Sequence, residues 1–250
     1  MPIEVENIDQ FMIIRLTGRR GNAINHDMMS SLVTITSELS NVQGLILTGT
    51  GRFFSTGLDI IEADTFEQQE MRTFIDAFDN YLLHIAALPI PTVALLNGHA
   101  IGGGLLTTFA CDYRIAQPGD YRLVLEQLSL GLSLPAVSLE LTRRAVPADL
   151  FFKVSTEGIS VEPHAALDMG MIQQLAVDPM VAAVKMLSHL SRSPQAYAKF
   201  KAHALQPLID TVAQYGESIN TDFVDAWFDP DSAQLRKAAI KRLKKDQPIN

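Results

Sequence analysis

Short apolar runs recur along the first half of the chain and predict buried strands. Each run is rich in aliphatic or aromatic residues and is too short for a helix. Segments with helical spacing or turn residues separate them. Alternating strands and helices predict an α/β fold. The four runs are FMIIRL at residues 11–16, GLILT at residues 44–48, TVALL at residues 92–96 and DYRIA at residues 112–116.

The clearest helical pattern follows residue 64. Asp64 and Glu67 have the spacing of a capping box. Apolar residues then recur on one helical face. A second helix is predicted to begin near Asp27, and a short apolar helix spans residues 105–110. The apolar face after residue 67 consists of Met71, Phe74, Ile75, Phe78, Leu82 and Ile85.

Strand patterns end near residue 178. Helical patterns follow at residues 181–190, 194–215 and 231–244, and Ser232 is a predicted N-cap of the last helix. We therefore predict a core of residues 1–178. A C-terminal helical region of residues 179–250 packs on this core or on another subunit.

The least charged stretch, residues 93–116, contains Gly98 and three consecutive glycines at residues 102–104. An apolar run of this length raises the question of a membrane span. Asn97 and His99 interrupt it, and each of three adjacent glycines would weaken a helix by about 1 kcal/mol. The glycines therefore favour a loop over a transmembrane helix.

The net charge limits the classes of molecule that the protein is expected to bind. The formal net charge is −8, which argues against nucleic acid, because phosphate binding needs clustered Lys and Arg. The one basic cluster, LRKAAIKRLKK at residues 235–245, is interpreted as a solvated helix end whose cations complement the helix dipole. The single cysteine, Cys111, and an N-terminus without signal-peptide order favour a cytoplasmic protein.

Several familiar sites are missing from the sequence. No G-x-G-x-x-G follows a strand, no P-loop motif occurs, and no G-x-S-x-G nucleophile elbow is present. The histidines are scattered without the spacing of metal ligands, so no metal site is expected. What remains is a pair of predicted strand-to-helix loops, FFSTGLDI at residues 53–60 and HAIGGGLL at residues 99–106.

Each of these loops can leave a backbone N–H free at a helix N-terminus, where the dipole favours negative charge. Two such donors on one carbonyl oxygen would form an oxyanion hole. Glycine permits the close approach that this needs. The alternative, that the glycines only turn the chain, stays open on these residues alone.

The sequence resembles the crotonase superfamily, also called the enoyl-CoA hydratase/isomerase family. Besides the two loops, the matching segments include RGNAIN at residues 20–25, ACDYRIA at residues 110–116, LEQLSLGLSLP at residues 125–135 and ISVEPHAALDMGMI at residues 159–172. The resemblance implies a spiral of repeated ββα units and C-terminal helices that build a homotrimer or hexamer. It also implies an acyl-CoA thioester substrate whose enolate a backbone oxyanion hole stabilises, with no cofactor beyond the CoA of the substrate.

Carried over position by position, the resemblance assigns roles to individual residues. The oxyanion donors are the N–H groups of Leu58 and Gly103, next to Gly102 and Asp59. Arg19 and Arg20 lie where basic residues meet the CoA phosphates. The carbonyls expected to hold the adenine belong to Ala23, Thr56 and Leu58.

The chain departs from hydratases of this family at both catalytic glutamates. The first position holds Leu106, which makes hydration unsupported and resembles the isomerases that move a β,γ double bond into conjugation. The second position holds Gln127, whose amide cannot serve as a base. Glu126 is adjacent, but in a continuing strand it would face the other way unless a bulge intervened.

Our first hypothesis is therefore an enoyl-CoA isomerase-like enzyme with Glu126 as an unconventional base. Decarboxylation of a malonyl-type thioester is a variant of it, and a non-catalytic acyl-CoA-binding homologue or a purely structural module are alternatives. His84 is a secondary candidate on the long helix. Asp59, Asp112 and His99 are expected to be structural.

Overall fold

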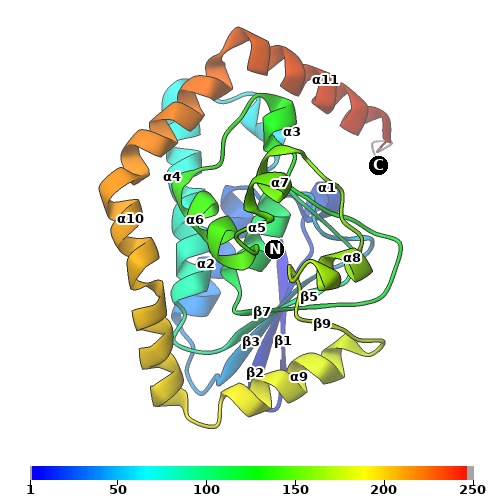
Figure 1. Cartoon of the computed structure of the whole chain (residues 1–250), viewed down its shortest axis with the longest axis vertical. Coiled ribbons are helices and arrows are strands. Elements are labelled where there is room, and N and C mark those ends of the chain that lie inside the picture. The colour runs from blue at the N-terminus through cyan, green and yellow to red at the C-terminus, as the bar shows by residue number, and fades with distance from the viewer. Residues whose placement is uncertain (1, 247–250) are drawn as a thin grey trace.

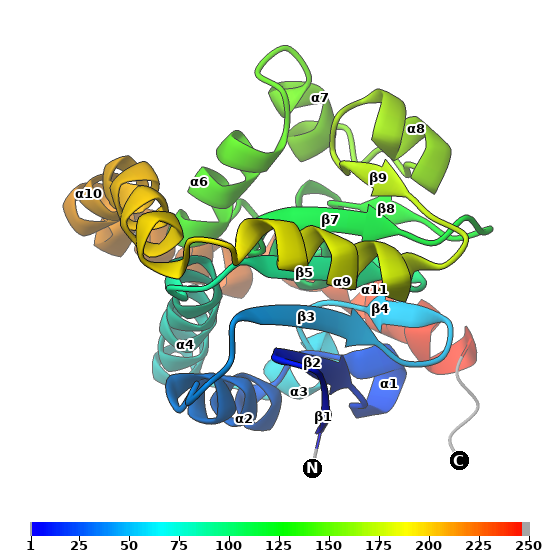
Figure 2. The same cartoon turned by 90° about the horizontal axis from the view of Figure 1, so that it is seen from below.

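A six-stranded sheet forms the base of the fold (Figures 1 and 2). The computed structural model describes the backbone of residues 2–246 and the side chains of residues 2–243. β1 pairs antiparallel with β2, and every other neighbouring pair in this sheet is parallel. Its strands, in spatial order, are β1 (Ile3–Ile8), β2 (Phe11–Leu16), β3 (Gly44–Gly49), β5 (Thr92–Leu96), β7 (Tyr113–Ala116) and β9 (Gln174–Leu175).

A smaller parallel sheet of three strands stands beyond the ends of β3, β5 and β7. It contains β4 (Phe53–Ser55), β6 (His99–Ile101) and β8 (Leu123–Val124). The chain passes from β3 to β4 and from β5 to β6 through short turns, and a helix follows each pair. This repeated strand–strand–helix plan brings the two glycine loops to adjacent positions, since β4 pairs with β6.

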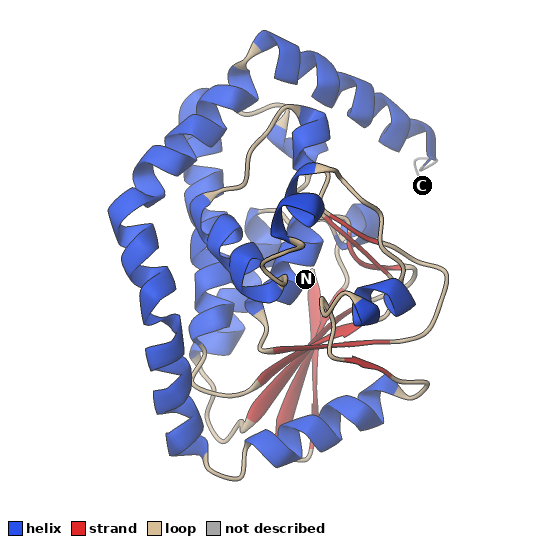
Figure 3. Ribbon diagram, in the orientation of Figure 1, coloured by secondary structure: helices blue, strands red, loops and turns tan. Residues whose placement is uncertain are grey.

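Helices cover the sheets on both sides (Figure 3). A 3-10 helix, η1 (Gln127–Leu130), follows β8. The α-helices are α1 (Arg19–Asn22), α2 (His26–Ser37), α3 (Ile60–Ala63), α4 (Gln68–Ala87), α5 (Gly103–Ala110), α6 (Ala136–Ala145), α7 (Phe151–Thr156), α8 (Pro163–Asp168), α9 (Pro179–Leu190), α10 (Pro194–Phe228) and α11 (Pro230–Asp246).

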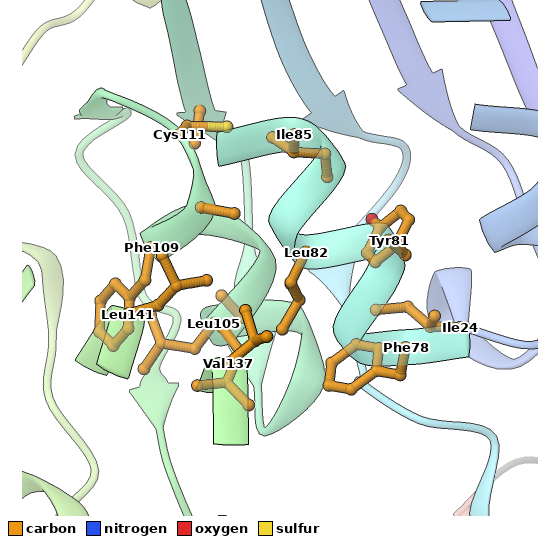
Figure 4. Close-up of a cluster of buried hydrophobic side chains, with 14 of the residues drawn as sticks. Ile24, Phe78, Tyr81, Leu82, Ile85, Leu105, Phe109, Cys111, Val137 and Leu141 are labelled. Atoms are coloured by element: carbon orange, nitrogen blue, oxygen red, sulfur yellow. The ribbon is translucent and has the colours of Figure 1, made fainter. Parts of the chain in front are cut away.

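The main core lies between α4, α5 and α6. Figure 4 shows Phe78 and Leu82 of α4 facing Leu105 of α5 and Val137 of α6, and all four side chains are buried. α10 packs along α4 and α6 and adds Trp227 and other apolar side chains to this core. The predicted apolar face of α4 is therefore buried in this core.

A second core lies on the other face of the large sheet. Ala183 and Leu187 of α9 pack against Phe11, Ile46 and Val93, and Figure 2 shows α9 crossing β5 and β7. Residues 179–246 thus contribute to both cores, while the division of the chain at residue 178 stays a prediction.

The predicted strands and the long helices are confirmed, but several boundaries differ. The capping box of α4 is formed by Glu67 and Glu70, because the helix begins at Gln68 and Asp64 instead ends α3. Asp229, not Ser232, accepts the first N–H groups of α11. α10 runs on to Phe228 although Pro207 lies inside it.

In the part of the chain that the structure describes, no helix combines the length and the apolarity needed to cross a membrane. The glycine-rich stretch instead forms β5, a tight turn, β6 and the eight-residue helix α5, all largely buried.

Candidate active site

The two glycine loops touch each other at Gly57 and Gly103. Gly57 has φ of +84°, and a Cβ placed on it would lie 2.8 Å from the Gly103 nitrogen. A Cβ on Gly103 would in turn lie 3.1 Å from the Leu58 nitrogen. Side chains are thus excluded from this contact, and the N–H groups of Leu58 and Gly103 are neighbours.

The N–H groups next to Leu58 and Gly103 in the chain form backbone hydrogen bonds, whereas those of Leu58 and Gly103 do not. The Asp59 N–H donates to the Ile24 carbonyl, and the Gly102 N–H donates to the Val124 carbonyl. Among the described residues, neither the Leu58 nor the Gly103 N–H has an acceptor. Gly103 is also the first residue of α5, so the helix dipole favours negative charge at its N–H. Two adjacent free donors fit one carbonyl oxygen.

Close packing fixes the second loop. A Cβ on Gly104 would lie 2.3 Å from the Ser55 carbonyl oxygen, so α5 lies directly against β4. Leu106, one turn further along α5, is 3% exposed. Leu106, which the resemblance assigns to the first glutamate position of hydratases, is therefore a buried apolar side chain.

The segment proposed to hold CoA lies beside the first loop. The Thr56 N–H donates to the Gly21 carbonyl, and the Thr56 hydroxyl donates to the Arg20 carbonyl at 2.8 Å. The guanidinium of Arg20 is engaged with the Asp59 carboxylate at 2.5 Å. Asp59 also caps α3 by accepting the Glu62 N–H. Both arginines are exposed, but Arg20 is partly committed to an ion pair.

The carbonyls of Ala23 and Thr56 accept no hydrogen bond from the described residues, while the Leu58 carbonyl accepts the Ile60 N–H at 2.8 Å. Ala23 and Thr56 therefore keep a free acceptor for a bound group. The Leu58 carbonyl could accept from a bound group only in competition with the Ile60 N–H at the start of α3.

The segment that contains Glu126 and Gln127 has a conformation that the sequence pattern did not predict. β8 ends at Val124 and the chain enters η1, so the alternation of strand faces does not apply to residues 126 and 127. The amide nitrogen of Gln127 donates to the Ser155 carbonyl at 2.8 Å. Its amide oxygen is buried and has no partner among the described residues. Gln127 therefore ties η1 to α7.

Glu126 directly precedes η1 and has no hydrogen-bonding partner for its carboxylate among the described residues. Burial of the carboxyl raises its pKa from the ordinary value of 4.5, and the charge of Arg242 on α11 opposes the rise. The residue retains considerable exposure. An exposed carboxyl without a hydrogen-bonding partner is accessible for proton transfer, which leaves Glu126 as the candidate base.

Three other polar residues are held elsewhere. His84 Nε2 lies 2.8 Å from the Thr36 hydroxyl on α2. The Nδ1 atom of His99 accepts the Arg122 N–H. Asp112 forms a 2.8 Å ion pair with Lys201. The structural roles expected for His99 and Asp112 agree with these contacts, and His84 is likewise engaged by a residue of α2.

The sequence analysis missed the part that α11 plays. Its Ser232 hydroxyl donates to the Gly131 carbonyl at the end of η1, and its Arg236 lies 4.0 Å from Asp64 at the end of α3. Arg236 is 3% exposed, so the basic cluster is not solely a solvated face. Side chains beyond residue 243 of that cluster lie outside the described part.

Two hollows in the described surface lie away from the oxyanion loops. One is lined by Cys111, Asp112 and Lys201, and the other by Asp79, Val137 and Asn220. No group of three or more His, Cys, Asp or Glu residues in residues 2–243 is arranged to hold a metal ion.

Comparison with known proteins gives concordant matches. A family model described as enoyl-CoA hydratase/isomerase matches residues 8–247. An enoyl-CoA isomerase/hydratase of Mycosarcoma maydis is 27% identical over 207 residues, which is 82% of this chain and 75% of the relative. The peroxisomal enoyl-CoA delta isomerase 2 of Arabidopsis thaliana is 24% identical, covering 79% and 89% of the two chains.

Among solved structures, human mitochondrial delta3-delta2-enoyl-CoA isomerase matches with a TM-score of 0.93. The match covers 99% of this chain and 100% of the human one, at 19% sequence identity. This likeness shows a shared fold and confirms the predicted α/β architecture.

Proposed function

Because the chain belongs to the enoyl-CoA hydratase/isomerase family, whose members act on acyl-CoA thioesters, we propose that it is an enolate-forming enzyme of isomerase type. The observation that carries the proposal is the pair of adjacent, free N–H groups at Leu58 and Gly103. The thioester oxygen of a β,γ-enoyl-CoA would accept both. Removing a proton from the α-carbon then places negative charge on that oxygen, where the two donors stabilise it.

Glu126 is the proposed base. It takes the α-proton and returns it to the γ-carbon, which leaves the double bond conjugated with the thioester. Its raised pKa brings its basicity closer to that needed for proton transfer. Gln127 positions η1 through Ser155 and has no proton-accepting role. The buried Leu106 supplies an apolar wall, which suits transfer of one proton without addition of water.

Substrate binding is assigned to the segment beside the first loop. Arg19 is exposed and is proposed to contact the CoA phosphates together with Arg20, while Ala23 and Thr56 offer free carbonyls to the adenine. Proton transfer within the acyl group needs no cofactor beyond the CoA itself. We also propose a homotrimer, or a hexamer of two trimers, in a cytoplasmic setting. Sedimentation analysis of the purified protein would test the assembly.

The test is conversion of a β,γ-enoyl-CoA to its conjugated isomer by the parent protein and two variants. Glu126→Gln should lower the rate by about 10²–10⁴-fold, the usual contribution of a general base. Gln127→Ala, one residue away, should keep the rate within a few-fold. A near-parent rate in Glu126→Gln would contradict the choice of base.

The pH dependence follows from the same carboxyl. The base acts when ionised, and burial raises the pKa of Glu126 above 4.5. The rate should therefore rise with pH through that raised pKa and fall away on its acid side. A rate that is flat across this window would exclude Glu126.

A second candidate function is acyl-CoA binding without turnover. The observation in its favour is that Leu106 and Gln127 replace both of the carboxylates expected for hydration. A thioester that binds but neither isomerises, exchanges its α-proton nor, for a malonyl-type acyl group, releases CO₂ would support this candidate. Release of CO₂ would instead identify a decarboxylase.

A further inference from the structure

A cavity of about 200 Å³ lies between α10, the C-terminal ends of α5 and α6, and the start of β7. It is separate from the candidate active site. The proposed oxyanion donor Gly103 is the first residue of α5, whereas the cavity touches Phe109 and Ala110, the last two residues of that helix. At 1.5 Å per residue, the two places are about 10 Å apart along α5. No residue assigned to the oxyanion hole, the base or CoA lines the cavity.

The cavity has an excess of positive charge. Its charged lining residues are Arg114, Arg144, Lys201 and Asp112. Lys201 and Asp112 form an ion pair at 2.8 Å, so their charges offset each other. Within the described part of the chain, neither Arg114 nor Arg144 forms an ion pair with a carboxylate. Both arginine charges therefore remain uncompensated, although the formal net charge of the chain is −8.

Arg114 provides a donor that is already held in place. The residue is 5% exposed. Its Nε donates to the Met171 carbonyl at 2.7 Å, and its Nη1 donates to the Cys111 carbonyl at 3.1 Å. Its Nη2 has no partner among residues 2–243, but this atom is not sealed from solvent. The structural contacts of Arg114 thus use two of its nitrogens and leave the third for a group in the cavity.

Arg144 stands at the rim of the same cavity. It is exposed, and its Nη1 donates to the Ala204 carbonyl on α10 at 2.8 Å, while its Nε and Nη2 have no partner among the described residues. Burial lowers the pKa of Arg114 to about 10, and the charge of Arg144 adds to this lowering. The two guanidinium groups are therefore close enough to repel each other, and an anion between them would stabilise both charges.

The remaining wall indicates the kind of anion. Phe109, Leu141 and Leu205 are buried apolar residues that line the cavity. Binding sites with apolar walls and a few polar groups suit ligands that combine a hydrocarbon body with a polar end. A guanidinium fork matches the two oxygens of a carboxylate. The volume equals that of roughly six or seven waters at about 30 Å³ each, so the ligand must be small.

We propose that this cavity binds a small carboxylate with an apolar body, such as a short aliphatic or aromatic acid, at one site per chain. The carboxylate accepts hydrogen bonds from Nη2 of Arg114 and from the free N–H groups of Arg144. The apolar body packs against Phe109 and Leu141. This site goes beyond the proposed function, because it uses none of the residues assigned to catalysis and requires no thioester.

The experiment is a titration of the full-length protein with hexanoate and with benzoate, followed by ligand-observed NMR. Hexanamide and benzamide are the matched probes, since each keeps the apolar body and lacks the charge. At least one carboxylate should bind about tenfold or more tightly than its amide, because hydrogen bonds to charged groups are the stronger ones. Inorganic phosphate, which has charge but no apolar body, should bind more weakly than that carboxylate.

Substitutions of exposed residues on α6 locate the site with little risk to folding. Arg144→Gln should weaken carboxylate binding about tenfold and leave amide binding unchanged. Arg144→Lys keeps the charge without the fork and should have an intermediate affinity. Arg143→Gln is the matched control, because Arg143 does not line the cavity and its guanidinium carbon lies 4.8 Å from the Phe151 ring centroid. This variant should bind the carboxylate as the parent does.

Each contrary result overturns a defined part of the inference. Carboxylate binding that is unchanged in Arg144→Gln would place the ligand elsewhere. Equal affinity for carboxylates and amides, or phosphate binding as tight as that of every carboxylate, would exclude the proposed ligand class. No binding of either carboxylate at millimolar concentration would overturn the site itself. The proposed function is tested separately, since Arg144→Gln should convert a β,γ-enoyl-CoA at the parent rate whether or not the carboxylate binds.

Discussion

A single methyl group at residue 103 would test the oxyanion hole. The Cβ of Gly103→Ala would lie 3.1 Å from the Leu58 nitrogen and 3.2 Å from the Phe78 ring, so it fills the space that the substrate oxygen needs. We expect the conjugation rate to fall by about 10²–10³-fold, as when an oxyanion donor is lost. Both contacts are tighter than ordinary van der Waals packing, so the melting temperature should also fall, and the rate is therefore measured at a temperature at which the variant is folded. A near-normal rate would contradict the assignment.

At the scale of single residues, the sequence predicted those site residues that belong to short local motifs. The proposed donors at Leu58 and Gly103, and the proposed replacements of glutamate by Leu106 and Gln127, come from local motifs that resemble those of the family. The environment of Arg236 could not be predicted, because Asp64, Gly131 and Trp227 come from distant parts of the sequence. A cluster of Lys and Arg on a terminal helix gives no signal that one member is buried.

Among the elements, α11 depends on the close approach of Gly131. Gly131 has φ of +74°, and a Cβ there would lie 2.3 Å from the Ser232 hydroxyl and 3.0 Å from its Cα. Gly131→Ala should therefore displace α11 and increase the rate of tryptic cleavage after Lys237 or Lys241 several-fold. Digestion of the native protein followed by mass spectrometry measures this.

Gly51→Ala is the matched control for that variant. Gly51 has φ of +66°, but nothing lies within 4 Å of the place that a Cβ would take on it. Both variants carry the left-handed backbone cost of about 1–2 kcal/mol, and only Gly131→Ala meets α11. Equal proteolysis in the two variants would show that α11 is not held through this contact.

Longer strands could be predicted from the sequence, whereas the shortest could not. β2, β3, β5 and β7 carry continuous apolar runs, and each was expected from the sequence. β4, β6 and β8 have only two or three residues, which is too short for any periodicity to show. Their pairing depends on contacts across the sheet, so the turn of the chain into η1 after β8 was also missed.

At the scale of the whole molecule, the repeated strand–strand–helix plan explains why the site is where it is. Two successive units place their loops side by side through the β4–β6 pairing. The long α10 then carries the chain past α4 and α6, as Figure 1 shows, so that α11 returns to η1 and α3. The α/β class followed from the alternation of patterns, whereas this return depends on tertiary packing of the C-terminal helices.

The central claim is that this arrangement makes an enolate from an acyl-CoA thioester. The most direct measurement is the uptake of deuterium at the α-carbon of a β,γ-enoyl-CoA incubated with the protein in deuterated water, followed by mass spectrometry. The account predicts catalysed uptake that is lost in Gly103→Ala and in Glu126→Gln and is kept in Gln127→Ala. No uptake across a series of acyl chain lengths, despite measurable binding of the thioesters, would contradict it.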